Sequence, residues 1–360
     1  MSSIPRRPRV RALLALALLL PGAPAPAEEA TPAAGGGCRD ELPDDAHRLD
    51  AMRAGLRRGV CSTARFVDRL FGGEHEYAEG EDDTNGRAGL ALEWDEQNQY
   101  DVDGRFRASI ELPALRERMN ATIGRASREE YVADELAEVG PAGSSFSDDQ
   151  PAEWFAGIGY RVLRERDSRL DLGAGVKLES PLNPYANARY RHYVYLSDQL
   201  LLTLRTTAFV ENGEGFGVTQ AFDLDRVLER DWLLRWGNSF RLSEETAGVR
   251  WRTRLALYQA IDYRRALRYE ASVRGESDGT QPDYYGLGLT HRRSMLRNWL
   301  FFEFGVTLFW ADGPLPSDRC QACVGASAGF EVLFGDAYDR ALRREAQGGA
   351  PAQGSLRNLD

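Results

Sequence analysis

Apolar and polar residues alternate along the chain from residue 86 onward, in one segment after another. In the segment 249–259, Trp251 and Leu255 belong to a mainly apolar set of alternate positions, whereas Arg252 and Arg254 belong to a polar set. A β-strand places successive side chains on opposite faces of a sheet. Each such segment therefore predicts a strand with two unlike faces.

The alternation divides the chain into fourteen candidate strands. Twelve strands are the alternative, because the hairpin 185–210 and the segments within 214–242 are the least regular. Segments of about ten residues match a tilted membrane-spanning strand, and an even number returns the chain to the side from which it started. The candidate strands cover residues 86–94, 104–113, 116–125, 153–163, 169–178, 185–196, 199–210, 214–224, 232–242, 247–259, 266–276, 283–291, 298–310 and 322–335.

The two faces of these strands differ from those of a soluble β-sandwich. The polar face is rich in Arg, Glu and Gly, and the apolar face carries aromatic residues near strand ends. Aromatic girdles at both interfaces are typical of membrane barrels. The tryptophans near predicted strand ends are Trp94, Trp154, Trp232, Trp236, Trp299 and Trp310. We therefore expect an all-β protein that forms a single antiparallel transmembrane β-barrel over residues 86–335, with its polar face toward the lumen.

The N-terminus predicts export. Four arginines precede the apolar run 12–20, which is too short to span a bilayer, and small residues follow at 25–27. This order is typical of a secretory signal peptide, predicted here as residues 1–27. Cleavage of this peptide removes four arginines and no acidic residue, so the net charge of the chain changes from −10 to −14. An acidic balance argues against binding to nucleic acid, which needs a basic surface.

The last predicted strand carries a short motif, formed by Ser327, Gly329, Val332 and Phe334. It resembles the C-terminal β-signal of Gram-negative outer-membrane barrels, although that family usually ends at the aromatic residue and this chain continues to residue 360. The run 66–72 also resembles a segment of uncharacterised porin-like outer-membrane proteins. The resemblance implies an outer-membrane location with both termini in the periplasm. It also implies outer-membrane lipid and the barrel-assembly machinery as partners, but no particular activity.

The segment 28–85 precedes the barrel and contains apolar residues at helical spacing. We expect a periplasmic helical segment, which either docks below the barrel or enters the lumen as a plug. Cys38 and Cys61 flank its first helix and are expected to form a disulfide in an oxidising compartment. The acidic stretch 74–83 could bind Ca²⁺ through oxygens, but a solvated linker is the favoured interpretation. The tail 336–360 is expected to be flexible.

The predicted lumen holds more basic than acidic side chains. One hypothesis is an electropositive wall that draws small anionic solutes through the barrel. The other is a cross-strand Arg–Glu network that stiffens the barrel and nearly closes it. Neither hypothesis requires a cofactor or a metal. The candidate solute-binding residues are Arg189, Arg191, Arg205, Arg235, Arg250, Arg252, Arg254, Arg268, Arg274, Glu270 and Glu303.

Other segments suggest other functions. The interval 126–152 is acidic, contains Gly and Pro, and is expected to be a long outer loop. A structural or surface-interaction barrel, such as an adhesin or receptor acting through this loop, is therefore the alternative function.

Cys320 and Cys323 are expected to form a small disulfide in the loop before the last strand, in preference to a redox or zinc site. A lipase would need a Ser–His pair, and His291 with Ser294, placed in a turn, is the one weak candidate.

Overall fold

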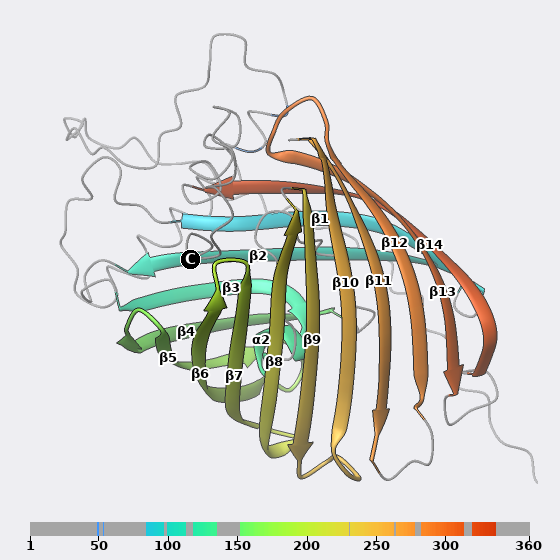
Figure 1. Ribbon diagram of the computed structural model, residues 1–360. Helices are drawn as coiled ribbons and strands as arrows, with labels where there is room; N and C mark the ends of the chain where they lie inside the picture. The colour runs from blue at the N-terminus through green and yellow to red at the C-terminus, as the bar shows by residue number, and fades with distance from the viewer. Residues whose placement is uncertain are drawn as a thin grey trace, which may run out of the picture. The chain divides into compact units, whose positions relative to one another are not determined.

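The structure is a computed structural model that describes residues 49, 53, 84–96, 99–112, 118–134, 152–229, 231–262, 264–277, 282–312 and 319–335. These residues form fourteen strands and one short helix, α2 (Arg128–Tyr131), shown in Figure 1. The strands are β1 (Thr84–Asp95), β2 (Gln99–Leu112), β3 (Met119–Ser127), β4 (Ala152–Arg164), β5 (Ser168–Lys177), β6 (Asn183–Ser197), β7 (Leu200–Glu211), β8 (Gly215–Glu229), β9 (Trp232–Ser243), β10 (Arg250–Asp262), β11 (Arg265–Glu276), β12 (Tyr284–Ser294), β13 (Leu300–Asp312) and β14 (Arg319–Gly335).

The strands close into one antiparallel barrel in which each strand pairs with its neighbours in the sequence. β14 closes the barrel on β1, in a register that runs from Asn85↔Gly335 to Asp95↔Gly325. The prediction of fourteen strands is confirmed, and the alternative of twelve is wrong. Within the described residues, no helix is long and apolar enough to cross a membrane.

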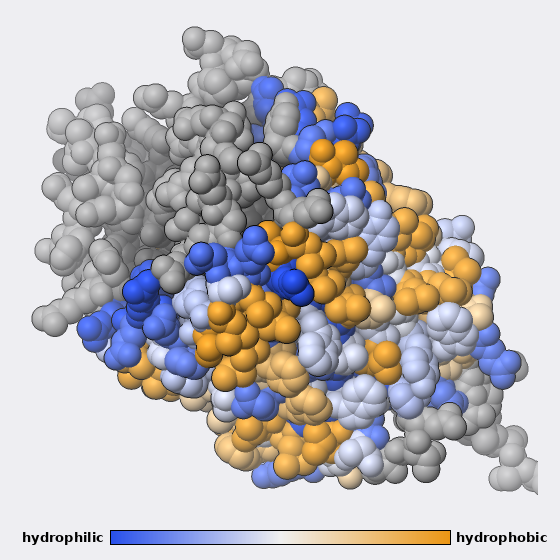
Figure 2. Space-filling model, viewed as in Figure 1, coloured by the Kyte–Doolittle hydropathy of each residue, from blue (hydrophilic) through white to orange (hydrophobic). Residues whose placement is uncertain are grey.

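The two faces of the strands separate as the alternation predicts. Outward positions carry large exposed apolar side chains, such as Leu90, Leu172 and Phe330. Inward positions carry buried charged side chains, such as Arg205 and Glu331. Figure 2 shows apolar residues grouped over the visible face of the barrel. An apolar outside around a polar inside suits a barrel surrounded by acyl chains.

The connections between strands differ at the two rims of the barrel. We call the rim where β1 begins and β14 ends the terminal rim, and the opposite one the loop rim. At the terminal rim β4 and β5, and likewise β6 and β7, are joined by only a few residues. At the loop rim the connection from β3 to β4 spans residues 128–151, of which the structure describes 128–134. Short turns on one side and a long loop on the other are the usual asymmetry of outer-membrane barrels.

The C-terminal strand takes the position that its motif suggests. Phe334 and Val332 lie on the outward side and are buried in an apolar cluster with Ala108, Trp299 and Leu300. Leu49, one of two described residues that precede β1, packs against this cluster. The second, Arg53, donates a hydrogen bond to the carbonyl of Leu333 (3.2 Å) and lies over the Trp299 ring, 5.3 Å from its centroid. These two residues dock at the terminal rim; the predictions of a plug, a Cys38–Cys61 disulfide, a Ca²⁺ site and a flexible tail lie outside the described residues.

Two boundary predictions are wrong. β8 was predicted to end at residue 224 but extends to Glu229, because the inward acid Asp225 belongs to the strand and not to a turn. Cys320 and Cys323 do form a disulfide, but they lie within β14 and not in the loop before it. The register of β13 against β14 shifts next to them, between Phe309 and Trp310, so the disulfide lies at an irregular part of the strand pair.

Candidate functional site in the barrel lumen

The start of the long loop enters the barrel. After β3, residues 128–134 form α2 and a turn, and they contact inward-facing side chains of several strands. Val132 and Ala133 are fully buried, and Asp134 is 6% exposed. The prediction of an outer loop over 126–152 is therefore wrong for residues 126–134, and residues 135–151 lie outside the described residues.

Local sequence explains part of this path. Glu129 and Glu130 occupy the first turn of α2, where negative charge is favourable at a helix N-terminus. Asp134 has a left-handed backbone (φ 53°), which Asp tolerates better than most residues with a Cβ. The chain can thus form one helical turn and then change direction inside the lumen.

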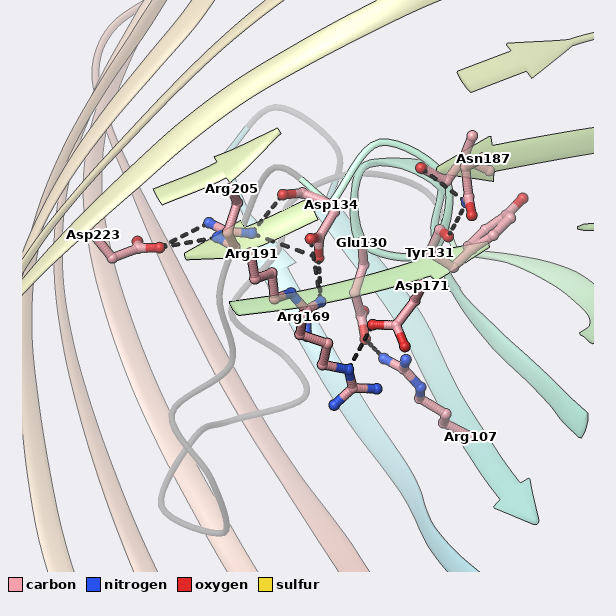
Figure 3. Close-up of polar contacts among 11 residues, drawn as sticks. Arg107, Glu130, Tyr131, Asp134, Arg169, Asp171, Asn187, Arg191, Arg205 and Asp223 are labelled. Atoms are coloured by element: carbon pink, nitrogen blue, oxygen red, sulfur yellow. Dashed lines mark hydrogen bonds and ion pairs between the residues drawn. The ribbon is translucent and has the colours of Figure 1, made fainter. Parts of the chain in front are cut away.

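Asp134 joins this inward segment to two neighbouring strands (Figure 3). Nη2 of Arg191 on β6 lies 3.0 and 3.1 Å from its two carboxylate oxygens. Arg205 on β7 donates to the Asp134 carbonyl and also binds the carboxylate of Asp223 on β8 (2.9 Å). Burial alone would raise the pKa of the Asp134 carboxyl, but Arg191, Arg205 and Arg189 hold it below its ordinary value. Asp134 is therefore an ionised anchor.

Tyr131 provides the apolar part of the attachment. Its ring stacks on Phe155 with centroids 4.1 Å apart, and it meets Tyr185 edge-on at 5.6 Å. Its hydroxyl donates to Glu153 on β4 (3.3 Å). Asn187 Nδ2 donates to the backbone carbonyls of Tyr131 and Val132 (3.4 and 3.2 Å), so the turn after α2 has its carbonyls satisfied in the lumen.

The charged residues of α2 extend the attachment around the barrel wall. Glu130 pairs with Arg107 on β2 (2.8 Å), and Glu129 with Arg241 on β9 (3.5 Å). Arg128 pairs with Glu211 at the end of β7 (2.6 Å) and also with Glu214 in the following turn. Lys177 on β5 binds the same Glu211 (2.6 Å) and Glu153 (3.0 Å). The four residues of α2 are thus bound to strands that are distant in the sequence.

A second ionic cluster lies near the terminal rim. Arg292 on β12 bridges Glu303 on β13 and Glu331 on β14, and its guanidinium lies 4.1 Å from the centroid of the Phe301 ring. Arg87 on β1 approaches Glu331 at 3.9 Å. These charged side chains are almost completely buried, so they tie the closing strands of the barrel together from the inside.

The wall formed by β9, β10 and β11 has a different charge arrangement. Arg250 lies directly opposite Arg241 of β9, and Arg252 directly opposite Arg274 of β11. Like charges at directly opposite positions of an antiparallel pair repel each other. Acids on the same strand pairs are fewer: Glu276 lies 4.0 Å from Arg250, and Glu270 pairs with Arg254 (3.1 Å) and Arg268 (3.6 Å). This wall therefore carries an excess of positive charge.

All eleven predicted lumen residues occupy inward-facing strand positions. The structure brings Arg189, Arg191 and Arg205 together around Asp134, and it places Arg235 against Asp225 (2.5 Å). Glu303 belongs to the cluster near the terminal rim, away from the other ten. That these eleven residues bind a solute stays a prediction.

Sequence reasoning missed the loop side of the lumen. Glu129, Glu130 and Asp134 were assigned to an outer loop, and their partners are inward residues far away in the sequence. The run from Arg128 to Tyr131 holds good helix formers next to a strand end, and that was the only local signal.

The described residues offer little support for catalysis or metal binding. His291 and Ser294 lie in β12, not in a turn, and on opposite faces of the strand, so they cannot form a Ser–His pair. Among the residues that the structure describes, no group of three or more His, Cys, Asp or Glu is placed to hold a metal ion.

A closed barrel with an apolar outside and a charged lumen has the architecture of a transmembrane β-barrel. No family model matches the sequence, and no curated protein matches it. Solved structures with a similar fold include the outer-membrane channel DcaP of Acinetobacter baumannii, with 8% identity, a TM-score of 0.46 and coverage of 70% of this chain and 97% of that one. OmpT, an outer-membrane protein of Vibrio cholerae, has 10% identity, a TM-score of 0.40 and coverage of 70% and 97%. A mutant of the Rh. blastica porin has 12% identity, a TM-score of 0.43 and coverage of 70% and 99%. At these values, none of the likenesses adds to what the surface and lumen of this barrel indicate.

Proposed function

We propose that the protein is an outer-membrane channel for small solutes, in which residues 128–134 narrow the lumen. The observation that carries this proposal is the attachment of a loop segment inside the barrel by ion pairs to β2, β6, β7 and β9. A barrel of fourteen strands is wider than the eight-stranded barrels that side chains alone can fill. A segment held across such a lumen limits the size of solutes without closing the wall.

We further propose that the channel prefers anions. The support is the wall of β9–β11, where Arg241 faces Arg250 and Arg252 faces Arg274, and where arginines outnumber acids. Rings or ladders of arginine in a pore attract anions, and low-dielectric walls strengthen the field. An anion lying between these arginines would also relieve their mutual repulsion.

The same proposal includes an orientation. Short turns lie at the terminal rim and the long loop at the loop rim, as in barrels whose termini face the periplasm. We infer that both ends of the barrel are periplasmic and that the barrel-assembly machinery acts on β14, with Ser327, Gly329, Val332 and Phe334 as its signal.

Conductance across planar lipid bilayers tests the function. The full-length protein should form discrete channels, and its reversal potential in a KCl gradient should show greater permeability for Cl⁻ than for K⁺. The double variant Arg252→Gln with Arg274→Gln should lose most of this preference, whereas Arg226→Gln, which removes an outward-facing arginine, should keep it. A folded protein without conductance would contradict the channel. A wild-type preference for K⁺ would contradict the anion preference alone.

The alternative of a surface-interaction barrel is not favoured by the described part of the loop. Residues 128–134 make their contacts inside the lumen and are not available to an external partner. Deletion of residues 135–151 with retention of conductance would separate a channel from a receptor.

A further inference from the structure

The barrel wall changes between β2 and β3. On one side, β2 pairs with β1 along its whole length, from Asp95↔Gln99 to Thr84↔Ile110. On the other side, β2 pairs with β3 only from Phe106↔Arg125 onward, toward the terminal rim. β3 ends at Ser127, and the chain then turns into the lumen as α2. Among the described strands, the part of β2 between Gln99 and Arg105 therefore has a ladder partner on one side only.

A crevice of about 360 Å³ lies at this place. Its apolar lining comes from outward-facing residues, among them Leu90, Val102, Phe106 and Trp154. Leu90 and Val102 are each 59% exposed, so the crevice opens on the face of the barrel that meets acyl chains. Its volume is in the lower part of the range for sites that bind small molecules.

The crevice also has a charged lining that connects the two faces of the wall. Asp103 faces the lumen and binds Arg105, whose side chain is buried on the lumen side (2.6 Å). The same carboxylate binds Arg125 (3.2 Å), which lies on the outward face between Phe106 and Trp154. Arg125 also donates to the carbonyl of Gly104. Outward position 104 has no side chain, which leaves space for the Arg125 guanidinium to reach inward.

The charge of this lining favours an anion. The charged group of this lining that lies on the outward face is Arg125, a cation. An outward arginine within the membrane is costly unless it has partners. A ligand with both a hydrocarbon chain and a negative charge fits this site better than an apolar molecule or a small anion, because the apolar wall and the arginine lie in the same crevice.

We propose that the crevice binds an anionic amphiphile from the membrane. Its acyl chain lies against Leu90, Val102 and Trp154, and its carboxylate or phosphate head binds Arg125. This site is separate from the solute path through the lumen, and it gives the barrel a lateral binding site in its wall. Binding of a head group there competes with Asp103 for the Arg125 guanidinium.

Photo-crosslinking of the full-length protein in nanodiscs of zwitterionic lipid tests this proposal. The probes are dodecyl phosphate and dodecanol, each carrying a diazirine on the chain, with peptide mapping by mass spectrometry. We expect the phosphate probe to label peptides that contain residues 89–106 and 125–154, and to do so roughly tenfold more than the alcohol, because a charge-assisted bond to arginine is lost in the alcohol. Unlabelled dodecyl phosphate should compete, and inorganic phosphate should not.

Two variants separate binding from misfolding. Arg125→Gln should reduce labelling by the phosphate probe roughly tenfold, and the matched variant Arg226→Gln, on the outward face of β8 at the other rim, should not. Gly104→Leu fills the crevice and keeps Arg125; a Cβ at 104 would meet Leu90 and Arg125 at ordinary contact distances of 3.7 and 3.8 Å. It should abolish labelling by both probes. Each variant is first shown to be folded by its heat-dependent migration on a gel. Equal labelling by phosphate and alcohol, equal loss in Arg125→Gln and Arg226→Gln, or competition by inorganic phosphate would overturn the proposal.

Discussion

The two sides of the lumen use the same residue types in opposite ways. On the side of β5–β8, Arg191 and Arg205 lie directly opposite each other and share the carboxylate of Asp134. On the side of β9–β11, arginines face arginines, as Arg252 faces Arg274. The first side is an ion-paired scaffold that holds residues 128–134, and the second carries more arginines than acids.

This difference separates structure from function within one surface. Breaking a buried ion pair leaves a charge without its partner and is strongly destabilising, whereas removing one of two facing like charges relieves repulsion. Counting the arginines of the lumen therefore cannot identify the site. Their acidic neighbours distinguish the two sides, because Arg191 and Arg205 share Asp134, whereas the acids near β9–β11 are fewer than the arginines.

The largest effect expected from this comparison is on stability. Arg205→Gln removes a cation that binds both Asp223 and Asp134. The three side chains are almost completely buried, so the free energy of unfolding should fall by about 3–5 kcal/mol. Arg252→Gln removes one of two facing arginines and relieves their repulsion, so it should cost less than Arg205→Gln. Urea unfolding of both variants in the same lipid vesicles, followed by tryptophan fluorescence, measures the two changes. Equal destabilisation by both substitutions would remove the distinction between the two sides.

The next effect concerns the inward loop segment. Asp134→Asn keeps the shape of the side chain but removes the charge that binds Arg191 and Arg205. A hydrogen bond to a charged group contributes about 1.5–3 kcal/mol, so the ratio of docked to undocked loop should fall roughly ten- to hundredfold. Single-channel recordings should then show higher mean conductance and more frequent fluctuations. Asp262→Asn, which removes an exposed pair with Arg265 (2.7 Å) at the other rim, is the matched control and should leave conductance unchanged.

The pH dependence of conductance follows from the same anchor. The lowered pKa of Asp134 means that its charge stabilises docking above the ordinary value of about 3.9. That stabilisation is lost as the pH falls from there through the lowered pKa. Conductance should therefore stay constant from neutral pH down to about 4 and rise below it. Asp134→Asn should reduce this rise, and the pairs of Glu129 with Arg241 and of Glu130 with Arg107 still attach the loop in that variant. A rise that begins near neutral pH would show that another group controls the loop.

Much of the fold follows from the sequence, because alternation is a local property. Leu255 and Arg254 already differ in face when they are neighbours in the chain, and the strand ends follow wherever the alternation stops. The strand boundaries predicted from the alternation are wrong at Asp225, where an acid in a strand resembles a turn, and at Cys320, which lies in β14 next to a shift in register.

The candidate site follows only in part, because pairing in the lumen is not local. The inward direction of Arg191 and Arg205 could be predicted from their own strands. Their shared partner Asp134 is more than fifty residues away in the sequence, in a segment whose acidic composition suggests solvent. No pattern within residues 126–152 indicates that the barrel wall supplies the complementary charge.

The smallest effect tests whether the attachment of the loop depends on charge or on packing. Tyr131→Phe removes the hydroxyl that donates to Glu153 but keeps the stack on Phe155. Burial, followed by the nearby Glu153 and Glu211, raises the pKa of Tyr131 well above its ordinary value, so the lost group is a neutral donor at any working pH. Glu153 keeps Lys177 as a partner, and the cost should be about 0.5–1.5 kcal/mol. Conductance should change less than in Asp134→Asn, and Tyr131→Ala, which also loses the ring, should change it more than Tyr131→Phe. If Tyr131→Phe opened the channel as far as Asp134→Asn, the single Tyr131–Glu153 hydrogen bond, and not the ion pairs on the side of β5–β8, would hold the segment in the lumen.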